Sequence, residues 1–180
     1  MKGVNLITEN PITPERLSQL RSAAGEGPLL ILTHDSPDPD ALASGNAMGF
    51  LCEQAWQIPC ELAYTGLVAR AENRTMLHLL TPKWKRVDDL SDLSRFSGVA
   101  LVDTQPAAGN NRLPEGIIPQ IVIDHHHPVR ESLGRVAYAD VRPDLGSTTT
   151  MLFQYLEAAE ITPNADLATA MFYGLQTDTK

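Results

Sequence analysis

Three short apolar runs in this sequence each end directly in a cluster of Asp and His. LLILT precedes HDSPDPD (residues 34–40), VALV precedes Asp103 and Thr104, and QIVI precedes DHHH (residues 124–127). Runs of this length, rich in Ile, Val and Leu, are typical of parallel strands buried on both faces. Ligands of such sheets bind outside the carboxyl ends of the strands. The sequence therefore predicts a metal site at one edge of a parallel sheet.

Length and composition fit one domain of ordinary composition. With 180 residues, 43% hydrophobic and 20% charged, the chain can bury a substantial core. No apolar stretch approaches the roughly 20 residues of a membrane span, and the opening segment lacks the apolar centre of a signal peptide. Cys52 and Cys60 cannot build a disulfide framework. We therefore expect a cytoplasmic protein without a membrane partner.

The net charge of −8 argues against a surface that holds duplex nucleic acid by neutralising its phosphates. It does not exclude a nucleotide substrate. Carboxylates that surround divalent cations count as negative in a formal sum, although the cations neutralise them in the folded site.

Helix and strand signals alternate along the chain. Strands are predicted at 29–33, 61–65, 99–102, 121–123 and 136–139, and helices at 13–24, 41–56, 71–80, from 146–149 to about 159, and 165–175. The stretch 105–119, rich in Pro, Gly and Asn, is expected to be a surface loop. The pattern predicts an α/β fold, with a doubly wound, mostly parallel sheet and helices on both faces.

The first cluster presents His34, Asp38 and Asp40 on a loop that Pro37 and Pro39 stiffen, since proline fixes φ. A stiff loop lowers the cost of bringing carboxylates together. Taken alone, Asp40 could simply cap the helix that follows. The whole set is better explained as a group of metal ligands.

Asp103 ends an otherwise apolar strand, where an unpaired carboxylate would be costly to bury. An Asx-turn at the strand end is the alternative for this residue alone. Its position, equivalent to that of the other two clusters, favours a cation ligand.

Asp124, His125 and His126 give the sharpest signal, because an acid and consecutive imidazoles at the end of a buried strand rarely serve packing. Neighbouring side chains of an extended backbone point in different directions. One His can bind metal while the next faces substrate, and Asp124 can orient a ligand from behind. His127, followed by Pro128, is expected to take no part.

The segments HDSPDPDA, LVDT, IDHHHP and GLQTDT resemble, in order and spacing, four motifs of the DHH phosphoesterase superfamily. The superfamily includes RecJ-type exonucleases, oligoribonuclease and phosphoadenosine-phosphate phosphatases, cyclic-dinucleotide phosphodiesterases, family II inorganic pyrophosphatases and exopolyphosphatase-related proteins. The resemblance covers about residues 29–180. It is specific for the superfamily and far less so for the substrate.

The resemblance implies two divalent cations, with manganese first and magnesium or cobalt as alternatives. One cation would be held by His34, Asp38 and Asp103, and the other by Asp40, Asp103, His125 and Asp178. Asp103 would bridge the two and so serve catalysis. His126 would contact the phosphate and protonate the leaving group. Spacing alone would not single out Asp178, because an Asp in Thr-Asp-Thr after a helix is more often a cap or turn residue.

The chemistry of these ligands agrees with that assignment. Four carboxylates carry four negative charges that two divalent cations offset, and carboxylate with only two imidazoles suits manganese or magnesium better than a thiolate-type zinc site. Two such metals, roughly 3.5–4 Å apart, can activate a water and clamp the oxygens of an in-line displacement.

Weaker candidates for substrate contact lie in two further segments. Ser147 and Thr148 could offer hydroxyls and amides to a phosphate, although a plain N-cap is the commoner role. Arg70 and Asn73 lie where a loop meets a helix, and a solvated surface is as good an explanation for them.

The resemblance also implies a second domain of the DHHA1 type, whose motifs have no match here, so residues 1–180 are expected to be a catalytic domain cut from a larger protein. We expect a metal-dependent phosphoesterase acting on short nucleotide substrates, such as an oligoribonucleotide, phosphoadenosine phosphate or a cyclic dinucleotide. An inorganic pyrophosphatase or exopolyphosphatase, and a non-catalytic metal- or nucleotide-binding module, are the alternatives. The expected partner is a small nucleotide or short single strand, not duplex DNA, and a homodimer stays open.

Overall fold

A computed structural model describes residues 11–179 of the chain. The helices are α1 (Pro14–Ala24), α2 (Pro39–Trp56), α3 (Ala71–Leu79), α4 (Thr148–Ala158), α5 (Ala165–Asp178) and the short 3-10 helix η1 (Glu131–Arg135). The strands are β1 (Leu29–Leu32), β2 (Cys60–Tyr64), β3 (Trp84–Arg86), β4 (Gly98–Val102), β5 (Ile121–Asp124) and β6 (Tyr138–Val141). All of the expected elements are present. The short strand β3 and η1 carry no apolar pattern strong enough to have predicted them.

The strands form one parallel sheet in the order β3-β2-β1-β4-β5-β6. The chain builds outward from β1 to β3 on one side, then crosses to β4 and builds outward to β6 on the other. The order therefore reverses between β1 and β4. In open α/β sheets, the crevice at the carboxyl ends of the strands beside such a reversal is where ligands bind.

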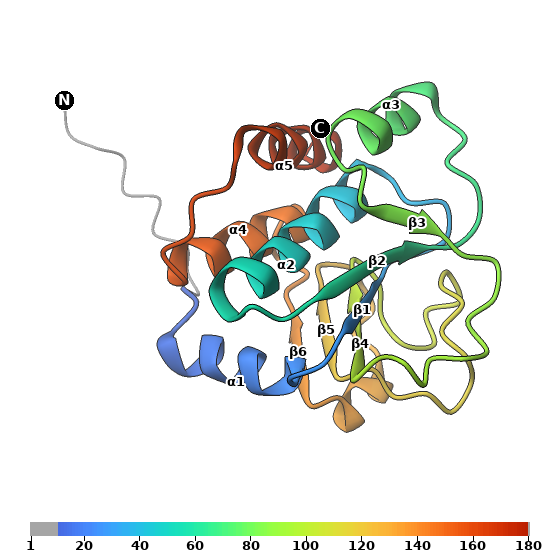
Figure 1. Cartoon of the computed structure of the whole chain (residues 1–180), viewed down its shortest axis with the longest axis vertical. Coiled ribbons are helices and arrows are strands. Elements are labelled where there is room, and N and C mark those ends of the chain that lie inside the picture. The colour runs from blue at the N-terminus through green and yellow to red at the C-terminus, as the bar shows by residue number, and fades with distance from the viewer. Residues whose placement is uncertain (1–10, 180) are drawn as a thin grey trace.

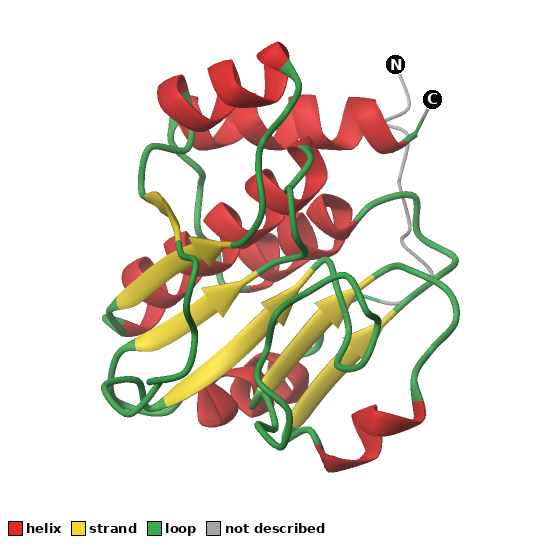
Figure 2. Ribbon diagram, turned by 90° about the vertical axis from the view of Figure 1, so that its right-hand side faces the viewer, coloured by secondary structure: helices red, strands yellow, loops and turns green. Residues whose placement is uncertain are grey.

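The two faces of the sheet are covered differently, as Figures 1 and 2 show. The five α-helices contribute to the larger apolar cluster on one face, where Leu42, Met48 and Tyr155 are completely buried. The smaller cluster on the other face, around Leu30 and Leu101, is covered by loops and η1. The α/β class and the parallel sheet are confirmed, and the helix on the second face is a single 3-10 turn.

Helix α5 approaches α2 and α4 closely at Gly174. A Cβ placed there would lie 2.9 Å from the carbonyl oxygen of Pro39 and 3.0 Å from the Cβ of Ala43. A side chain would therefore push α5 away from α2. The close contact matters for the site, because it sets the position of Asp178 in the last turn of α5 relative to the start of α2.

The loop 105–119 differs in part from the expected surface loop. Most of its residues are exposed or partly exposed, but Gln105 is only 2% exposed. Its side chain donates hydrogen bonds to the Asp124 carboxylate and to the carbonyl of His126, and it accepts one from the amide of Arg130. The start of the loop is therefore a buried connector between β4 and β5, because Gln105 satisfies polar groups that the strand ends leave open.

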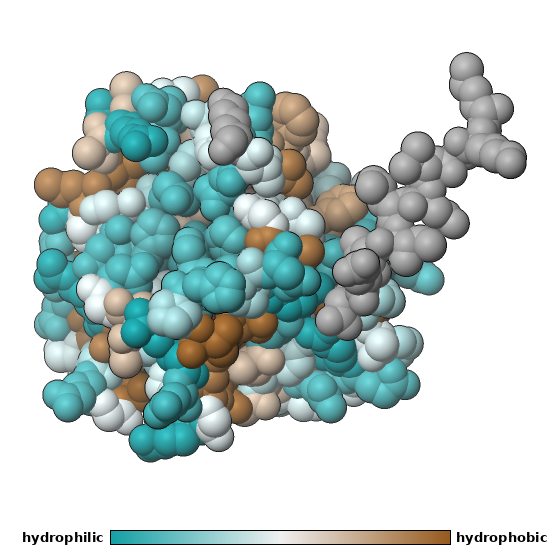
Figure 3. All heavy atoms as spheres, turned by 180° about the vertical axis from the view of Figure 1, so that it is seen from behind, coloured by the Kyte–Doolittle hydropathy of each residue, from teal (hydrophilic) through white to brown (hydrophobic). Residues whose placement is uncertain are grey.

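No helix within residues 11–179 is long and apolar enough to cross a membrane. The face shown in Figure 3 is mostly hydrophilic, with separate hydrophobic patches. Single exposed apolar side chains are normal on globular proteins.

Candidate metal centre

The ends of β1 and β4 bring His34 and Asp103 together. Leu32 pairs with Leu101, and each of the two site residues lies two positions beyond its strand partner. The Nε2 atom of His34 lies 3.5 Å from Oδ2 of Asp103. Asp103 has a φ of 62°, a left-handed conformation that is uncommon for any residue but glycine and that Asp tolerates better than most. The strained turn lies at the point where the strand order reverses.

The first turn of α2 supplies two carboxylates with different surroundings. Asp38 is the N-cap, its Oδ1 accepts a hydrogen bond from the amide of Ala41, and the same oxygen lies 3.8 Å from Nε2 of His34. Asp40 is fully buried. Asp38 is therefore the N-cap of α2, and the alternative that Asp40 caps this helix is wrong. The carboxylate of Asp40 instead faces the site.

The N-terminus of α4 holds the Asp40 carboxylate. The amides of Thr148 and Thr149 donate to its two oxygens at 2.8 and 2.9 Å. The hydroxyl of Thr148 donates to Oδ1 of Asp103 at 2.6 Å. Backbone amides at a helix start favour negative charge, so α4 fixes both buried carboxylates in place.

His125 reaches the same carboxylates from the end of β5. Its Nε2 lies 3.7 Å from Asp40, 3.8 Å from Asp103 and 3.3 Å from Asp178. Its Nδ1 lies 3.2 Å from the carbonyl of Leu145, which fits an N–H donated to that oxygen. The buried Nε2 has no hydrogen-bond partner among residues 11–179. An imidazole nitrogen presented to three carboxylates without a partner suits a cation between them.

Three overlapping groups of side chains could each hold a metal ion, because their ligand atoms lie within 4.8 Å of one another. The groups are His34, Asp38 and Asp103; Asp40, His125 and Asp178; and Asp103, His125 and His126. The first two are the two predicted ligand sets, apart from the bridging Asp103 of the second. The predicted metal ligands therefore all gather at one place.

His126 stands beside the cluster and is half exposed. Its Nδ1 lies 2.8 Å from Oδ1 of Asp124 and 3.8 Å from Oδ1 of Asp103. Asp124 is buried and also accepts from Gln105. Sequence reasoning missed Gln105, whose position immediately after the Asp103–Thr104 pair was the only available signal. Asp124, itself bonded by Gln105, holds the ring of His126 through Nδ1, and the Nε2 atom of the ring has no hydrogen-bond partner among residues 11–179.

The electrostatics of the cluster show strong repulsion among the acids. Burial and the neighbouring Asp103 raise the pKa of Asp40 well above its usual value. Burial opposes a charged His34, but contacts with Asp103 and Asp38 raise its pKa to about 11. Burial likewise opposes a charged His125, while Asp178, Asp103 and Asp40 raise its pKa to about 9. Positive charge is therefore stabilised at both imidazole positions.

In the His126–Asp124 pair, one imidazole is hydrogen-bonded to one carboxylate, and the pKa values of the two groups shift in opposite directions. The hydrogen bond to Asp124 raises the pKa of His126. Burial acts to raise the pKa of Asp124, yet the hydrogen bonds from His126 and Gln105 hold it below its usual value. The pair favours a protonated His126 beside an ionised Asp124.

The four weaker candidates divide into two pairs. Ser147 and Thr148 are buried, and their hydroxyls contact protein groups, since Ser147 caps α4 and Thr148 contacts Asp103. Arg70 and Asn73 instead line a hollow of 340 Å³ whose wall also includes Asp38 and Asp178. The structure thus places the second pair at an opening beside the acidic cluster.

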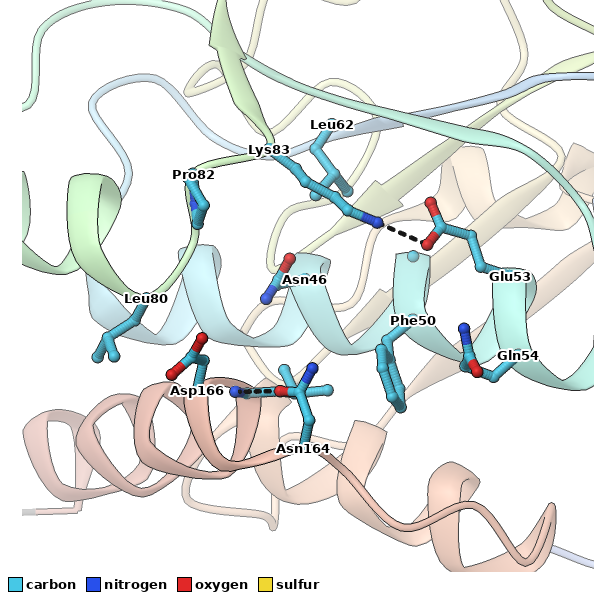
Figure 4. A pocket seen from close by; sticks show the side chains of 12 residues that line it. Asn46, Phe50, Glu53, Gln54, Leu62, Leu80, Pro82, Lys83, Asn164 and Asp166 are labelled. Carbon is cyan, nitrogen blue, oxygen red and sulfur yellow. Dashed lines mark hydrogen bonds and ion pairs between the residues drawn. The ribbon is translucent and has the colours of Figure 1, made fainter.

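A different pocket, shown in Figure 4, lies between α2 and the start of α5. Asn46, Phe50 and Asp166 face it, and an ion pair of Lys83 with Glu53 spans one side. Asp178 lies at the other end of α5, a helix of 14 residues and hence about 20 Å long. That pocket is therefore separate from the acidic cluster.

A parallel α/β sheet with a carboxylate and imidazole cluster at its topological reversal defines a class of protein suited to binding divalent cations and phosphate. Comparison with known proteins makes the assignment specific. The family model described as DHH family, N-terminal domain, matches residues 28–175. The chain belongs to the DHH phosphoesterase superfamily.

Relatives of this chain have longer sequences. An uncharacterized protein of Methanocaldococcus jannaschii is 41% identical over 155 residues, covering 86% of this chain and 31% of its own length. A probable manganese-dependent inorganic pyrophosphatase of Streptococcus equi subsp. zooepidemicus is 26% identical over 157 residues, covering 84% of this chain and 48% of its own. The chain thus spans half or less of these relatives.

Among solved structures, an exopolyphosphatase-related protein from Bacteroides fragilis has the same fold. The TM-score is 0.70 at 15% sequence identity, and the match covers 96% of this chain and 52% of the other. At this identity the likeness concerns the fold.

Proposed function

We propose that this domain is the catalytic part of a metal-dependent phosphoesterase that uses two divalent cations. The observation that carries the proposal is the buried, unpartnered Nε2 of His125, which faces Asp40, Asp103 and Asp178. Repulsion among these carboxylates and the geometry of the imidazole both favour a cation between them.

In this proposal one cation is held by His34, Asp38 and Asp103, and the other by Asp40, Asp103, His125 and Asp178. When bound, two such ions would activate a water and offset the charge on phosphate oxygens. Manganese is the first choice, because the donors are hard carboxylate oxygens with two imidazoles, and the pyrophosphatase relatives are described as manganese-dependent. Magnesium or cobalt are the alternatives.

The other residues of the site position substrate and move a proton. His126, held by Asp124 and half exposed beside Asp103, is placed to contact a phosphate and to give a proton to the leaving group. Thr148 and Thr149 keep Asp40 in one orientation. A fixed carboxylate lowers the reorganisation needed during the reaction.

The proposed substrates are short nucleotides, including oligoribonucleotides, phosphoadenosine phosphate and cyclic dinucleotides. Inorganic pyrophosphate or polyphosphate is the second candidate, favoured by the pyrophosphatase and exopolyphosphatase-related relatives. Both candidates place phosphate oxygens at the same acidic cluster. A binding module without turnover is the third reading, and a complete set of carboxylates and imidazoles speaks against it.

The relatives extend well beyond the segment that matches this chain. We therefore also propose that a second domain, expected to be of the DHHA1 type, completes the grip on the substrate in the whole protein. A cytoplasmic location and a homodimer remain predictions.

Asp103→Asn tests the proposal, because it keeps the shape and the hydrogen bond from Thr148 while removing the shared charge. Hydrolysis of pyrophosphate, a dinucleotide and an activated phosphodiester is measured with Mn²⁺. Loss of a ligand shared by both ions should cost about 10²-fold or more in kcat, an effect of several kcal/mol on the transition state. Calorimetry with Mn²⁺ should show a parallel loss of binding.

Glu157→Gln is the matched control, since it removes one negative charge from an exposed position of α4. It should leave both hydrolysis and Mn²⁺ binding unchanged. Activity that survives Asp103→Asn, or that persists in excess chelator, would contradict a two-metal mechanism.

A further inference from the structure

The two cysteines of the chain lie together, far from the acidic cluster. Cys52 is near the end of α2, and Cys60 is the first residue of β2. β2 begins at the amino edge of the sheet, where Cys60 pairs with the first residue of β1, whereas the cluster lies at the carboxyl edge. Along the axis of α2, Cys52 is about 18 Å from Asp40. The pair is therefore separate from the proposed metal centre.

The turn between α2 and β2 brings the two cysteines close. Gln57 ends the helix in a left-handed conformation with a φ of 57°. The next amide, that of Ile58, donates to the carbonyl of Cys52 at 3.0 Å. The Sγ atom of Cys60 in turn lies 3.6 Å from the carbonyl of Ile58. The backbone thus folds back so that the start of β2 lies beside the last turns of α2.

A glycine on α2 lets the side chain of Cys60 approach the helix. A Cβ placed on Gly49 would lie 3.9 Å from the Cβ of Cys60. Gly49 and Cys52 are three positions apart and therefore share one face of α2. Cys52 belongs to the larger apolar cluster, Cys60 packs against that cluster, and the two thiols are hydrogen-bonded to each other. The two sulfur atoms are therefore neighbours.

The two thiols differ in their access to solvent. Cys52 is completely buried, whereas Cys60 is partly exposed. The hydrogen bond with Cys60, together with burial, raises the pKa of the Cys52 thiol, so Cys52 keeps its proton. Reaction of a thiol with a solute requires an accessible sulfur in its thiolate form. Cys60 is thus the sulfur that a small molecule reaches, and the partner within reach of Cys52 is Cys60.

We propose that Cys52 and Cys60 form a redox pair, which a low-molecular-weight disulfide such as glutathione disulfide converts from a dithiol into an intramolecular disulfide. The Cys60 thiol gives its proton to solvent, and its sulfur attacks one sulfur of glutathione disulfide. The first glutathione leaves as a thiolate and takes up a proton. Cys52 then loses its proton and attacks the Sγ of Cys60, and the second glutathione leaves in the same way. Two protein thiols are oxidised to one disulfide, and one glutathione disulfide is reduced to two thiols.

The second attack is favoured because the two sulfurs are held side by side by α2 and β2. The bond would join the end of α2 to the start of β2 and would constrain the unfolded chain, which stabilises the folded one. It changes no residue of the acidic cluster. The inference therefore does not depend on the proposed function.

The test incubates the reduced full chain with mixtures of reduced and oxidised glutathione and measures its intact mass. The wild type should lose the mass of two hydrogen atoms, and proteolysis should yield peptides joined through Cys52 and Cys60. Cys52→Ala should stop at the mixed disulfide and carry one glutathione, because the thiol that displaces it is missing. Cys60→Ser should carry none, because Cys52 is shielded from solvent. Circular dichroism reports whether each variant is folded.

Cys52→Ala is the matched control for stability, because it keeps the exposed thiol but cannot close the bond. Oxidised wild type should melt several degrees above reduced wild type, dithiothreitol should reverse the shift, and Cys52→Ala should show no such rise. The proposal is overturned if the wild type stays reduced, stops at the mixed disulfide, or forms disulfides only between two chains. Glutathione bound to Cys52 in folded Cys60→Ser, or equal melting temperatures of the two wild-type forms, would also overturn it.

Discussion

At the scale of single residues, the cluster is a balance between carboxylates that repel one another and imidazoles that offset them. Asp103 is 3.5 Å from His34 and 3.8 Å from His125. In the absence of cations, protons on the imidazoles carry the compensating positive charge. Cations and protons must therefore compete for the same nitrogens.

Cation binding should release protons near neutral pH. The pKa of His34 is raised to about 11 and that of His125 to about 9, so both rings hold a proton there that a bound cation must displace. Raising the pH removes the competing protons, so Mn²⁺ affinity should rise with pH, first as His125 loses its proton at about pH 9 and then as His34 loses its proton at about pH 11. Calorimetry in buffers of different ionisation enthalpy measures the release. A Mn²⁺ affinity that does not vary between pH 6 and 8 would contradict this competition.

The sequence specified most of these residues, but for different reasons. His34, Asp103 and His125 follow apolar strands, and the carboxyl ends of parallel strands meet at one edge. Asp178 lies in a helix, and only the family resemblance pointed to it. The buried position of Gln105 could not be predicted, because burial of a polar side chain depends on tertiary contacts that a single sequence does not display.

At the scale of elements, the start of α4 holds the site together. Its amides bind Asp40, its Thr148 hydroxyl binds Asp103, and Ser147 caps the helix through the amide of Thr150. The sequence predicted a helix beginning at this point. It did not predict that the start of this helix contacts Asp40, because Asp40 lies more than 100 residues earlier in the chain.

Two substitutions at this helix start should have separate effects. Thr148→Val removes the hydrogen bond to Asp103 and should lower Mn²⁺ affinity about tenfold, as loss of a partner behind a metal ligand often does. Ser147→Ala removes the cap and should cost about 0.5–2 kcal/mol of stability without changing Mn²⁺ affinity. Denaturant unfolding and metal titration on both variants separate the two roles. Equal Mn²⁺ affinity in Thr148→Val and the wild type would show that Asp103 needs no support from α4.

At the scale of the whole molecule, cation binding and stability are linked. The proposed ligands come from the ends of β1, β4 and β5, the start of α2 and the end of α5. A cation bound among them stabilises only the assembled arrangement. The apolar runs and their alternation with helices predicted the fold class, but they did not predict the strand order. No sequence pattern indicated that loops cover the second face of the sheet.

Adding Mn²⁺ should raise the melting temperature. One site saturated at 100 times its Kd contributes about 2.7 kcal/mol, which corresponds to roughly 5–10 °C for a domain of this size. Thermal denaturation with Mn²⁺, Mg²⁺ and chelator measures the shift. Asp103→Asn should lose most of it and Glu157→Gln should not. A wild-type melting temperature that is the same in chelator and in excess Mn²⁺ would argue against sites of this affinity.

The position of Asp178 in the last turn of α5 has a consequence for protein synthesis. A ribosome translates the strands and helices β1 to α4 before it reaches this carboxylate. A nascent chain can therefore assemble the whole sheet and still lack one member of the cluster. Full affinity for cations should arise only when α5 has left the exit tunnel and settled against α2 at Gly174.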